Sequence, residues 1–215
     1  MFKVDFHSHT IYSSDSIATV SQQISAARAC GLNRLVITDH NTLQGAREAQ
    51  AAAPDLIIVG EEVQTTEGEL LAVFVTREVP RGLEPLEALK RLKDQGAFIS
   101  ISHPFDPHRS GWKMETLKML APLVEAIETC NGRMVKKEYN AWAEEFAAQH
   151  NLSGTAGSDG HHPSEIGRVY SLLPAFYNAE SLRIAIRGAQ SCGEISSPMV
   201  HFYSTWARIV KSTRR

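Results

Sequence analysis

The chain has 215 residues, of which 43% are hydrophobic and 21% charged, and its formal net charge at pH 7 is −2. This composition is typical of a globular protein, and we predict a single domain over residues 1–215. The slight negative charge excludes a global positive field that would attract nucleic acid. No apolar stretch approaches the roughly 18 residues of a membrane span, and Lys3 and Asp5 interrupt the apolar start, so we expect no secretory leader. Because Cys30, Cys130 and Cys192 are odd in number and far apart, they indicate a reducing, cytoplasmic location.

Short apolar runs alternate along the chain with segments that have helical patterns. Strands are predicted for residues 3–6, 34–38, 56–59, 70–75, 98–102, 124–129 and 152–156. Helices are predicted for residues 20–30, 42–53, 85–95, 114–120, 135–150 and 179–188, with Gly31, Pro54 and Gly96 as stop signals. The alternation predicts an α/β fold with a parallel sheet, either a closed barrel or an open doubly wound layer. The basic tail, residues 211–215, is expected to be a solvated end.

Polar residues that suit metal chemistry follow most of the predicted strands. They are His7 and His9, then Asp39 and His40, Glu61 and Glu62, His103, Glu128, and finally Asp159 and His161. In a parallel α/β barrel, the carboxyl ends of all strands open onto one face, where the loops build the site. We therefore expect these residues to converge on one rim, although they are spread over most of the chain.

Two pairs of these residues have the spacing of groups that point to the same side of a strand. His7 and His9 are two residues apart, and Asp159 and His161 repeat the arrangement with Gly160 between them. Imidazoles and carboxylates are ligands that Zn²⁺, Mn²⁺ and Fe²⁺ accept. Each motif alone has a simpler interpretation as a surface pair, a helix cap or a turn. Their occurrence at successive strand ends favours a metal site.

In this arrangement the sequence resembles the polymerase and histidinol phosphatase (PHP) superfamily of metal-dependent phosphoesterases. The matching motifs are D-x-H-x-H-T at 5–10, S-D at 14–15, I-T-D-H at 37–40, G-x-E at 60–62, S-H-P at 102–104, I-E-x-x-N-G at 127–132 and G-S-D-x-H at 157–161. They occur in the family's order and, with Arg168, cover residues 5–168. The resemblance implies a distorted (β/α)7 TIM-like barrel of the PHP type.

The resemblance also implies two or three divalent metal ions, Mn, Fe or Zn, in the barrel mouth. By the family's pattern, His7, His9, Glu62 and Asp159 would hold the first ion, Glu62 would bridge to a second ion held by His103, and Asp15, His40 and His161 would hold a third. Many family members have a ligating histidine where this chain has Glu69. Glu69 is either a carboxylate ligand, which would favour Mn²⁺ or Fe²⁺ over Zn²⁺, or a solvated strand end.

The activity implied is hydrolysis of phosphomonoesters by a hydroxide that the metals activate, with Asp159 and His161 as catalytic residues. The leaving group would receive its proton from His161 or from a metal-bound water. Asp39 and Asp5 are expected to orient ligand imidazoles. The substrate would be a small metabolite, a nucleotide or an oligonucleotide end.

Three arginines near the predicted rim are candidates for binding the substrate phosphate, in the order Arg168, Arg109 and Arg133. A planar guanidinium can bind a phosphate through two parallel hydrogen bonds. For each arginine, a structural ion pair is the alternative, for example between Arg168 and Glu165.

Other functions stay open at this point. A phosphodiesterase or exonuclease acting on short nucleic acid is one alternative, and a catalytically weak PHP binding module is another. An amidohydrolase barrel also begins with H-x-H, but it needs a bridging lysine after a middle strand, where this chain has Glu62. We expect a small phosphorylated substrate, no membrane partner and no stable nucleic-acid complex, because the chain has no basic stripe or regularly spaced aromatic residues.

Overall fold

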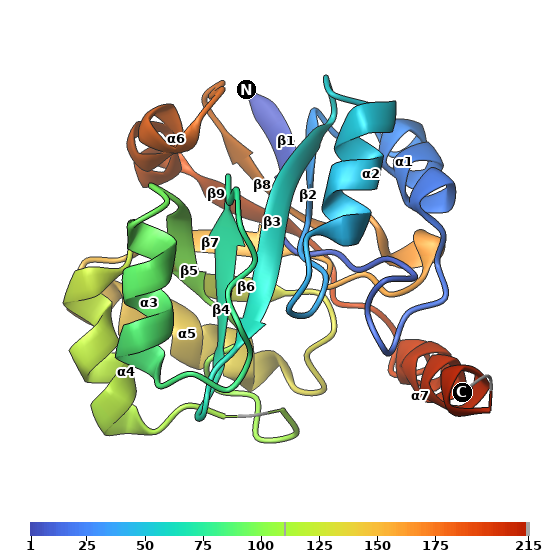
Figure 1. Cartoon of the computed structure of the whole chain (residues 1–215). Coiled ribbons are helices and arrows are strands. Elements are labelled where there is room, and N and C mark those ends of the chain that lie inside the picture. The colour runs from blue at the N-terminus through green and yellow to red at the C-terminus, as the bar shows by residue number, and fades with distance from the viewer. Residues whose placement is uncertain (110, 214–215) are drawn as a thin grey trace.

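The computed structural model describes residues 1–109 and 111–213 and shows a mixed α/β fold (Figure 1). Its strands are β1 (Phe2–Asp5), β2 (Arg34–Ile37), β3 (Ile57–Gln64), β4 (Glu69–Val73), β5 (Phe98–Ile101), β6 (Ala126–Asn131), β7 (Ser153–Gly157), β8 (Val169–Leu173) and β9 (Gln190–Gly193). Its α-helices are α1 (Val20–Ala29), α2 (Gln44–Ala52), α3 (Pro85–Lys93), α4 (Met114–Leu120), α5 (Lys137–His150), α6 (Ala179–Ala185) and α7 (Val200–Ser212). Among the helices of the described ranges, none has the length and hydropathy needed to cross a membrane.

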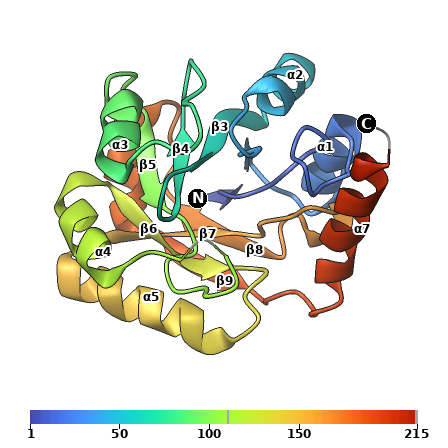
Figure 2. The same ribbon diagram turned by 60° about the horizontal axis from the view of Figure 1, so that its bottom comes forward.

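The strands form one sheet that curls into a nearly closed barrel, which confirms the predicted fold class (Figure 2). Their order is β7-β6-β5-β4-β3-β2-β1-β8-β9. The chain that follows β1 closes the barrel against β7 and the loop after it. Ser8 forms a parallel bridge with Gly160, and the Asp159 N–H donates to the His7 carbonyl oxygen at 2.8 Å. A Cβ on Gly157 would lie 2.4 Å from the His7 Cβ, so this approach requires glycine.

The prediction of a uniformly parallel sheet is wrong for β4, which pairs antiparallel with both neighbours. A turn in which the Thr65 N–H donates to the Gly68 carbonyl joins β3 to β4. A turn this short can only connect antiparallel strands. Glu69 pairs with Gln64, so the first residue of β4 lies at the same rim as the last residue of β3. The strands β8 and β9 also pair antiparallel, on the other side of β1.

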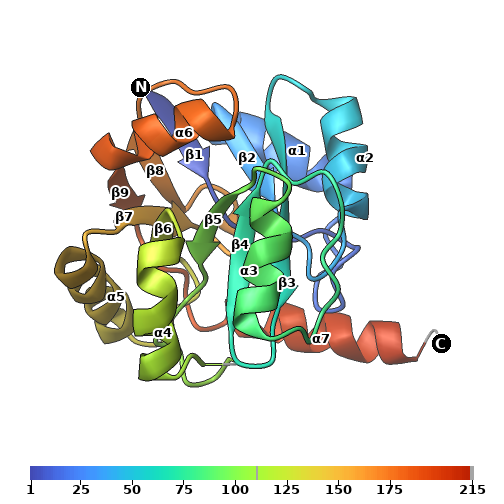
Figure 3. The same cartoon turned by 60° about the vertical axis from the view of Figure 1, so that its left-hand side comes forward.

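Inward-facing side chains divide the barrel into an apolar floor and a polar mouth. One cluster of buried residues fills the floor, where Phe6 stacks on Phe176 with 6.4 Å between the ring centroids. Helix α6 contributes to this cluster and covers the floor, at the end opposite α7 (Figure 3). Along β3, Ile58 belongs to the floor, and Glu62 follows on the same face because strand side chains alternate. The interior therefore changes from apolar to charged toward the mouth.

The sequence signals explain most helix ends but not the last helix. Thr19 caps α1 in a reciprocal arrangement with Gln22, and Pro85 begins α3. The expectation of a solvated basic tail over residues 211–215 is wrong for Lys211, which lies in α7 and donates hydrogen bonds to the Ile11 and Ser13 carbonyl oxygens. Residues 214–215 of that tail lie outside the described residues.

The structure makes stability depend on pH through Glu61, which alternates with Glu62 and is buried on the outer face of β3. Burial, helped by the charge of Glu78, raises the Glu61 pKa from 4.5 to about 8, although the Val79 N–H donates to its carboxylate. Between these two values the unfolded chain has lost the proton that the folded chain keeps. The free energy of unfolding should therefore fall by about 1.4 kcal/mol for each pH unit through this one group.

We expect Glu61→Gln to remove this loss of stability, because an amide oxygen can still accept from Val79 and carries no charge. Urea unfolding at pH 5, 6, 7 and 8 measures the effect as the difference between wild type and variant at each pH. The free energy of unfolding of the variant should increase relative to that of wild type as the pH rises. The exposed Glu144→Gln, in the middle of α5, is the matched control. A constant difference across this range would contradict the assignment.

Candidate metal centre

The structure brings together at the barrel mouth the nine residues that the sequence analysis names as metal ligands. They are His7, His9, Asp15, His40, Glu62, Glu69, His103, Asp159 and His161, and each has a side-chain nitrogen or oxygen within 3.9 Å of another member. All except His40 are buried. The convergence has the cause that the sequence analysis expects, because the loops after the strands open onto one face. Glu69 joins them only because β4 runs in the opposite direction.

Four of these side chains point at one common point. The Nε2 atoms of His7 and His9 are 3.1 Å apart, and they lie 3.2 and 3.4 Å from Glu62 Oε2. Asp159 Oδ1 lies 3.2 Å from the His9 nitrogen and 3.6 Å from that of His7. Ligand atoms about 2.0–2.1 Å from a tetrahedral ion are about 3.3 Å from one another. The four atoms therefore have the spacing of a coordination shell.

The hydrogen bonding of the carboxylates supports a cation at this point. In the part of the chain that the structure describes, Glu62 Oε2, Asp159 Oδ1 and Asp15 Oδ1 are buried without a hydrogen-bond donor. Buried polar atoms are normally satisfied, and an unpartnered buried carboxylate oxygen is costly. A divalent ion would satisfy these oxygens, so the residues present fit a metal.

Hydrogen bonds on the far side of three imidazoles, those of His7, His9 and His161, turn their Nε2 atoms toward the centre. His161 Nδ1 lies 2.7 Å from the Asp159 carbonyl oxygen, which can only accept, so the proton is on Nδ1. His7 Nδ1 lies 2.9 Å from Glu128 Oε1, and His9 Nδ1 lies 3.1 Å from Ser13 Oγ. These contacts turn the Nε2 atoms inward, which is the arrangement of ligating histidines.

Asp39 acts on these imidazoles through a hydroxyl group. The Ser13 hydroxyl donates to Asp39 Oδ1 at 2.7 Å and accepts from His9, so Asp39 fixes His9 indirectly. The expectation that Asp5 orients an imidazole is wrong. Its carboxylate accepts from the backbone N–H groups of His7, Ser158 and Gly167, because these three segments meet around it.

A second group of ligand atoms surrounds the other oxygen of Glu62. His103 Nε2 lies 3.0 Å from Glu62 Oε1 and 3.4 Å from Glu69 Oε2. Burial and the negative charge of Glu62 raise the pKa of Glu69. Glu62 thus faces the first group with one oxygen and this group with the other, which is the geometry of a bridge. The sequence analysis leaves Glu69 as either a metal ligand or a solvated strand end. Because Glu69 is buried beside His103, the structure favours the first interpretation.

The third group lies nearer the surface. Asp15 Oδ1 is 3.3 Å from His161 Nε2 and 3.5 Å from His40 Nε2. The rings of His40 and His161 both lie close to that of His9, with centroids 4.5 and 4.2 Å away. The three groups therefore adjoin one another, and His40 also reaches Glu62 through its Nδ1 at 3.1 Å.

The charges of the mouth keep the carboxylates ionised despite their burial. Burial by itself raises the pKa of Asp159, but Arg109, His7 and His161 together hold it well below its usual range. Burial likewise opposes ionisation of Glu62, and His7 with His40 lowers its pKa. The pKa of His9 falls to about 3, because of burial and because His161 and His40 adjoin it. Anionic carboxylates and a neutral imidazole are the protonation states that bind metals.

Two of the ligand candidates hold backbone angles that glycine normally adopts. Asp159 has φ of 54° and His103 has φ of 21°. The turn between Asp159 and His161 is therefore made by the aspartate itself. Gly160 leaves room for Ile166, since a Cβ there would lie 2.8 Å from Ile166 Cδ1 and would shift that side chain. Strained residues of this kind concentrate at functional sites.

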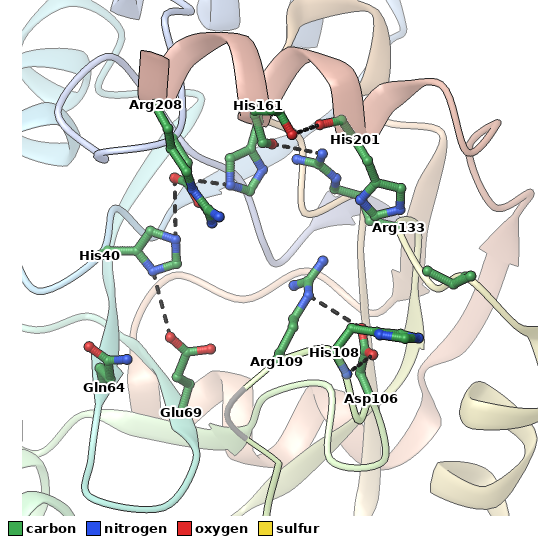
Figure 4. A pocket seen from close by; sticks show the side chains of 14 residues that line it. His40, Gln64, Glu69, Asp106, His108, Arg109, Arg133, His161, His201 and Arg208 are labelled. Atoms are coloured by element: carbon green, nitrogen blue, oxygen red, sulfur yellow. Dashed lines mark hydrogen bonds and ion pairs between the residues drawn. The ribbon is translucent and has the colours of Figure 1, made fainter. Parts of the chain in front are cut away.

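The three arginines predicted to bind substrate have different positions. Arg109 and Arg133 line a cavity of about 590 Å³ at the mouth (Figure 4). Arg109 also pairs with Asp159. Arg133 is buried, and its guanidinium lies 3.4 Å from Glu165. Arg168, ranked first in the sequence analysis, is exposed and does not line this cavity among the described residues. It immediately precedes β8, which turns away from the mouth along β1.

Two contributions to the mouth go beyond the sequence analysis, which lists Glu128 at a strand end without giving it a role and does not include helix α7. Glu128 binds His7 and also accepts from the His103 N–H at 2.9 Å. The signal for it was a charged residue inside an otherwise apolar strand. Helix α7 adds His201 and Arg208 to the cavity wall. Nothing in the motif pattern indicated α7, because it lies beyond the last motif.

Comparison with known proteins relates this chain to PHP-like proteins and their fold. A family model described as PHP-associated matches residues 137–191. The uncharacterized protein MJ0417 of Methanocaldococcus jannaschii is 34% identical over 174 residues, which cover 78% of this chain and 69% of that protein. A Bacteroides vulgatus two-domain protein, described as containing a predicted PHP-like metal-dependent phosphoesterase, superposes with a TM-score of 0.74 at 20% identity, over 96% of this chain and 69% of its own. The lesion-specific endonuclease EndoQ of Pyrococcus furiosus superposes with a TM-score of 0.64 at 16% identity, over 92% and 59%.

These similarities agree with the strand-end motifs, the barrel and the ligand geometry. The relatives differ in their described roles, so they identify the family and its fold. On this evidence the chain belongs to the PHP superfamily.

Proposed function

We propose that the protein is a metal-dependent phosphoesterase that hydrolyses phosphomonoesters, such as small phosphorylated metabolites, nucleotides or oligonucleotide ends. The observation that carries this proposal is the convergence of unpartnered carboxylate oxygens and imidazole nitrogens in a mouth that also holds guanidinium groups. The carboxylates and imidazoles suit divalent cations, and the guanidinium groups suit a phosphate anion. The two sets adjoin each other, since Arg109 contacts Asp159 directly.

Two or three divalent ions are part of the proposal. His7, His9, Glu62 and Asp159 would hold the first, Glu62, Glu69 and His103 the second, and Asp15, His40 and His161 the third. When bound, such ions lower the pKa of a water molecule to near 7 and neutralise negative charge on the phosphoryl group. The carboxylate of Glu69 favours Mn²⁺ or Fe²⁺ over Zn²⁺ in the second set.

The arginines of the cavity would orient the phosphate. Arg133 is fixed by Glu165 and by the Val200 carbonyl oxygen, and its Nη1 has no hydrogen-bond partner within the described residues. A buried unpartnered donor beside a cavity suits an anionic ligand. Arg109 is held between Asp106 and Asp159, so its position is coupled to that of a ligand.

The geometry refines the roles of the two residues expected to be catalytic. His161 keeps its proton on Nδ1 and directs an Nε2 lone pair inward, and burial lowers its pKa. This suits a ligand or proton acceptor better than the acid that protonates the leaving group. We therefore assign Asp159 and His161 to the metal-binding set, and solvent in the cavity supplies the proton.

A small substrate and a cytoplasmic location complete the proposal. The cavity of about 590 Å³ has the volume of small-molecule sites. Cys30, Cys130 and Cys192 are all free thiols, which supports a reducing compartment. No stable nucleic-acid complex and no membrane partner are proposed.

A phosphodiesterase acting on short nucleic acid is the second candidate. A neighbouring cavity of about 670 Å³ shares Asp15, His40, Gln64, Glu69 and Arg208 with the first. Two adjoining cavities could accept groups on both sides of a phosphate. The similarity of the fold to a lesion-specific endonuclease agrees with this candidate.

The proposal predicts that metal and activity are lost together. We expect His7→Ala and Asp159→Ala each to lower bound metal by at least one ion per chain and to lower hydrolysis of p-nitrophenyl phosphate by about a thousandfold or more. Metal content is measured by mass spectrometry after loading with Mn²⁺, Fe²⁺ or Zn²⁺. His150→Ala, on α5, is the control. Bis-p-nitrophenyl phosphate as the better substrate would favour the diesterase. No hydrolysis of either ester with any metal would overturn the proposal and favour a binding module.

Glu69 tests the second metal set separately. We expect Glu69→Ala to weaken binding of the second ion, because the proposed second set then has one carboxylate, Glu62, where the wild type has two. Glu69→His should restore binding with a shift in preference from Mn²⁺ toward Zn²⁺. Competition titrations with the two metals measure this preference. Unchanged stoichiometry and rate in Glu69→Ala would show that Glu69 is not a ligand.

A further inference from the structure

Helix α7 places an arginine at the mouth for which the sequence motifs give no role. We propose that Arg208 is a substrate-binding residue that contacts the phosphate of the ester, and this inference rests on the proposed function above. Arg208 lies 193 residues from Asp15 in sequence, and its Nη2 is 3.1 Å from Asp15 Oδ2. The proposal makes α7 a wall of the substrate cavity and not only a cover for the barrel edge.

The helix is fixed at both ends, so Arg208 is held toward the mouth. At its beginning, Arg133 donates to the Val200 carbonyl oxygen at 3.0 Å and to Ser204 Oγ at 2.8 Å. Near its end, Lys211 donates to the carbonyl oxygens of the loop after β1, including that of Ser13. Ser13 is the residue that fixes His9, so α7 is attached to the same loop that orients a ligand.

The face of α7 that lines the cavity is polar. His201, Ser204, Thr205 and Arg208 line the cavity at helical spacing, and Figure 4 shows His201 and Arg208 at this wall. The buried residues of the helix, Val200 and Ala207, are apolar and lie beside this polar row. A row of polar side chains facing a cavity is the arrangement expected of a ligand-binding wall.

Arg208 has hydrogen-bonding capacity left for a ligand. A guanidinium has five N–H donors, whereas Asp15 is its one hydrogen-bonded partner among the described residues. Its side chain is 69% exposed, so the remaining donors are accessible. Solvent around the exposed guanidinium screens its pairing with the buried Asp15, so the pair contributes little to stability, and ligand binding better accounts for the placement of Arg208.

Arg208 lies at the junction of the two cavities at the mouth, because its side chain lines both of them. Asp15, His40 and Glu69 lie at the same junction. Arg109 reaches the first cavity from the opposite side (Figure 4). A phosphate at this point would lie between two guanidinium groups and beside the candidate metal ligands, where hydrolysis would occur.

The test uses the full-length, Mn²⁺-loaded protein and compares Arg208→Gln, Arg208→Lys and the wild type. We expect Arg208→Gln to raise both KM for p-nitrophenyl phosphate and the Kd of inorganic phosphate about tenfold to a hundredfold, with metal content unchanged and kcat changed much less. Arg208→Lys should recover part of the loss, because an ammonium keeps the charge but not the planar fork. Arg187→Gln, an exposed arginine at the opposite end of the barrel, is the matched control. Calorimetry measures the phosphate affinity without turnover.

Each result separates this inference from the proposed function. If the wild type hydrolyses the ester and Arg208→Gln leaves KM and phosphate affinity within twofold of it, Arg208 is not a substrate ligand. If Arg208→Gln instead lowers metal content, with KM restored by added metal, the residue only positions Asp15, and the inference is overturned. A metal-loaded wild type that neither binds phosphate nor hydrolyses ester would overturn both.

Discussion

Four carboxylates that face one another in a barrel mouth are the constraint on which the rest of this structure depends. Asp15, Glu62, Glu69 and Asp159 are all buried or nearly so, and like charges at such distances repel. The protein can keep them there only if positive charge accompanies them. It supplies some of this charge with Arg109 and Arg208, and also with His7 and His40, whose pKa values the neighbouring carboxylates raise despite burial. The same arrangement that makes the mouth unstable by itself makes it a strong site for divalent cations.

Much of the site could be predicted because it follows from strand geometry. Carboxyl ends of parallel strands share one rim, so His7, His40 and His103 were expected to meet although a hundred residues separate them. Alternation along a strand likewise separates Glu62, which faces the mouth, from Glu61, which is buried outside. These rules need only the position of each residue relative to a strand end, and that information is local in the sequence.

The parts that could not be predicted depend on contacts between distant segments. Arg168 follows the last motif, yet the reversal of the chain into β8 turns it outward. Helix α7 departs from the usual amphipathic pattern, because it buries only Val200 and Ala207 while Phe202 and Trp206 are exposed and polar residues line the cavity. The direction of β4 is set by the turn before it, and its apolar run alone reads the same in either direction.

The reversed strand has a consequence for how this centre can vary. The other ligand candidates follow strands or, like Glu62, lie within one. Glu69 instead enters from a hairpin, as the first residue of β4, and Val73 further along the same face of this strand belongs to the floor. If Glu69 is a ligand, as proposed, its identity could therefore change between carboxylate and imidazole at a hairpin end. Such a hairpin would give one scaffold a place to vary its metal without rebuilding the frame.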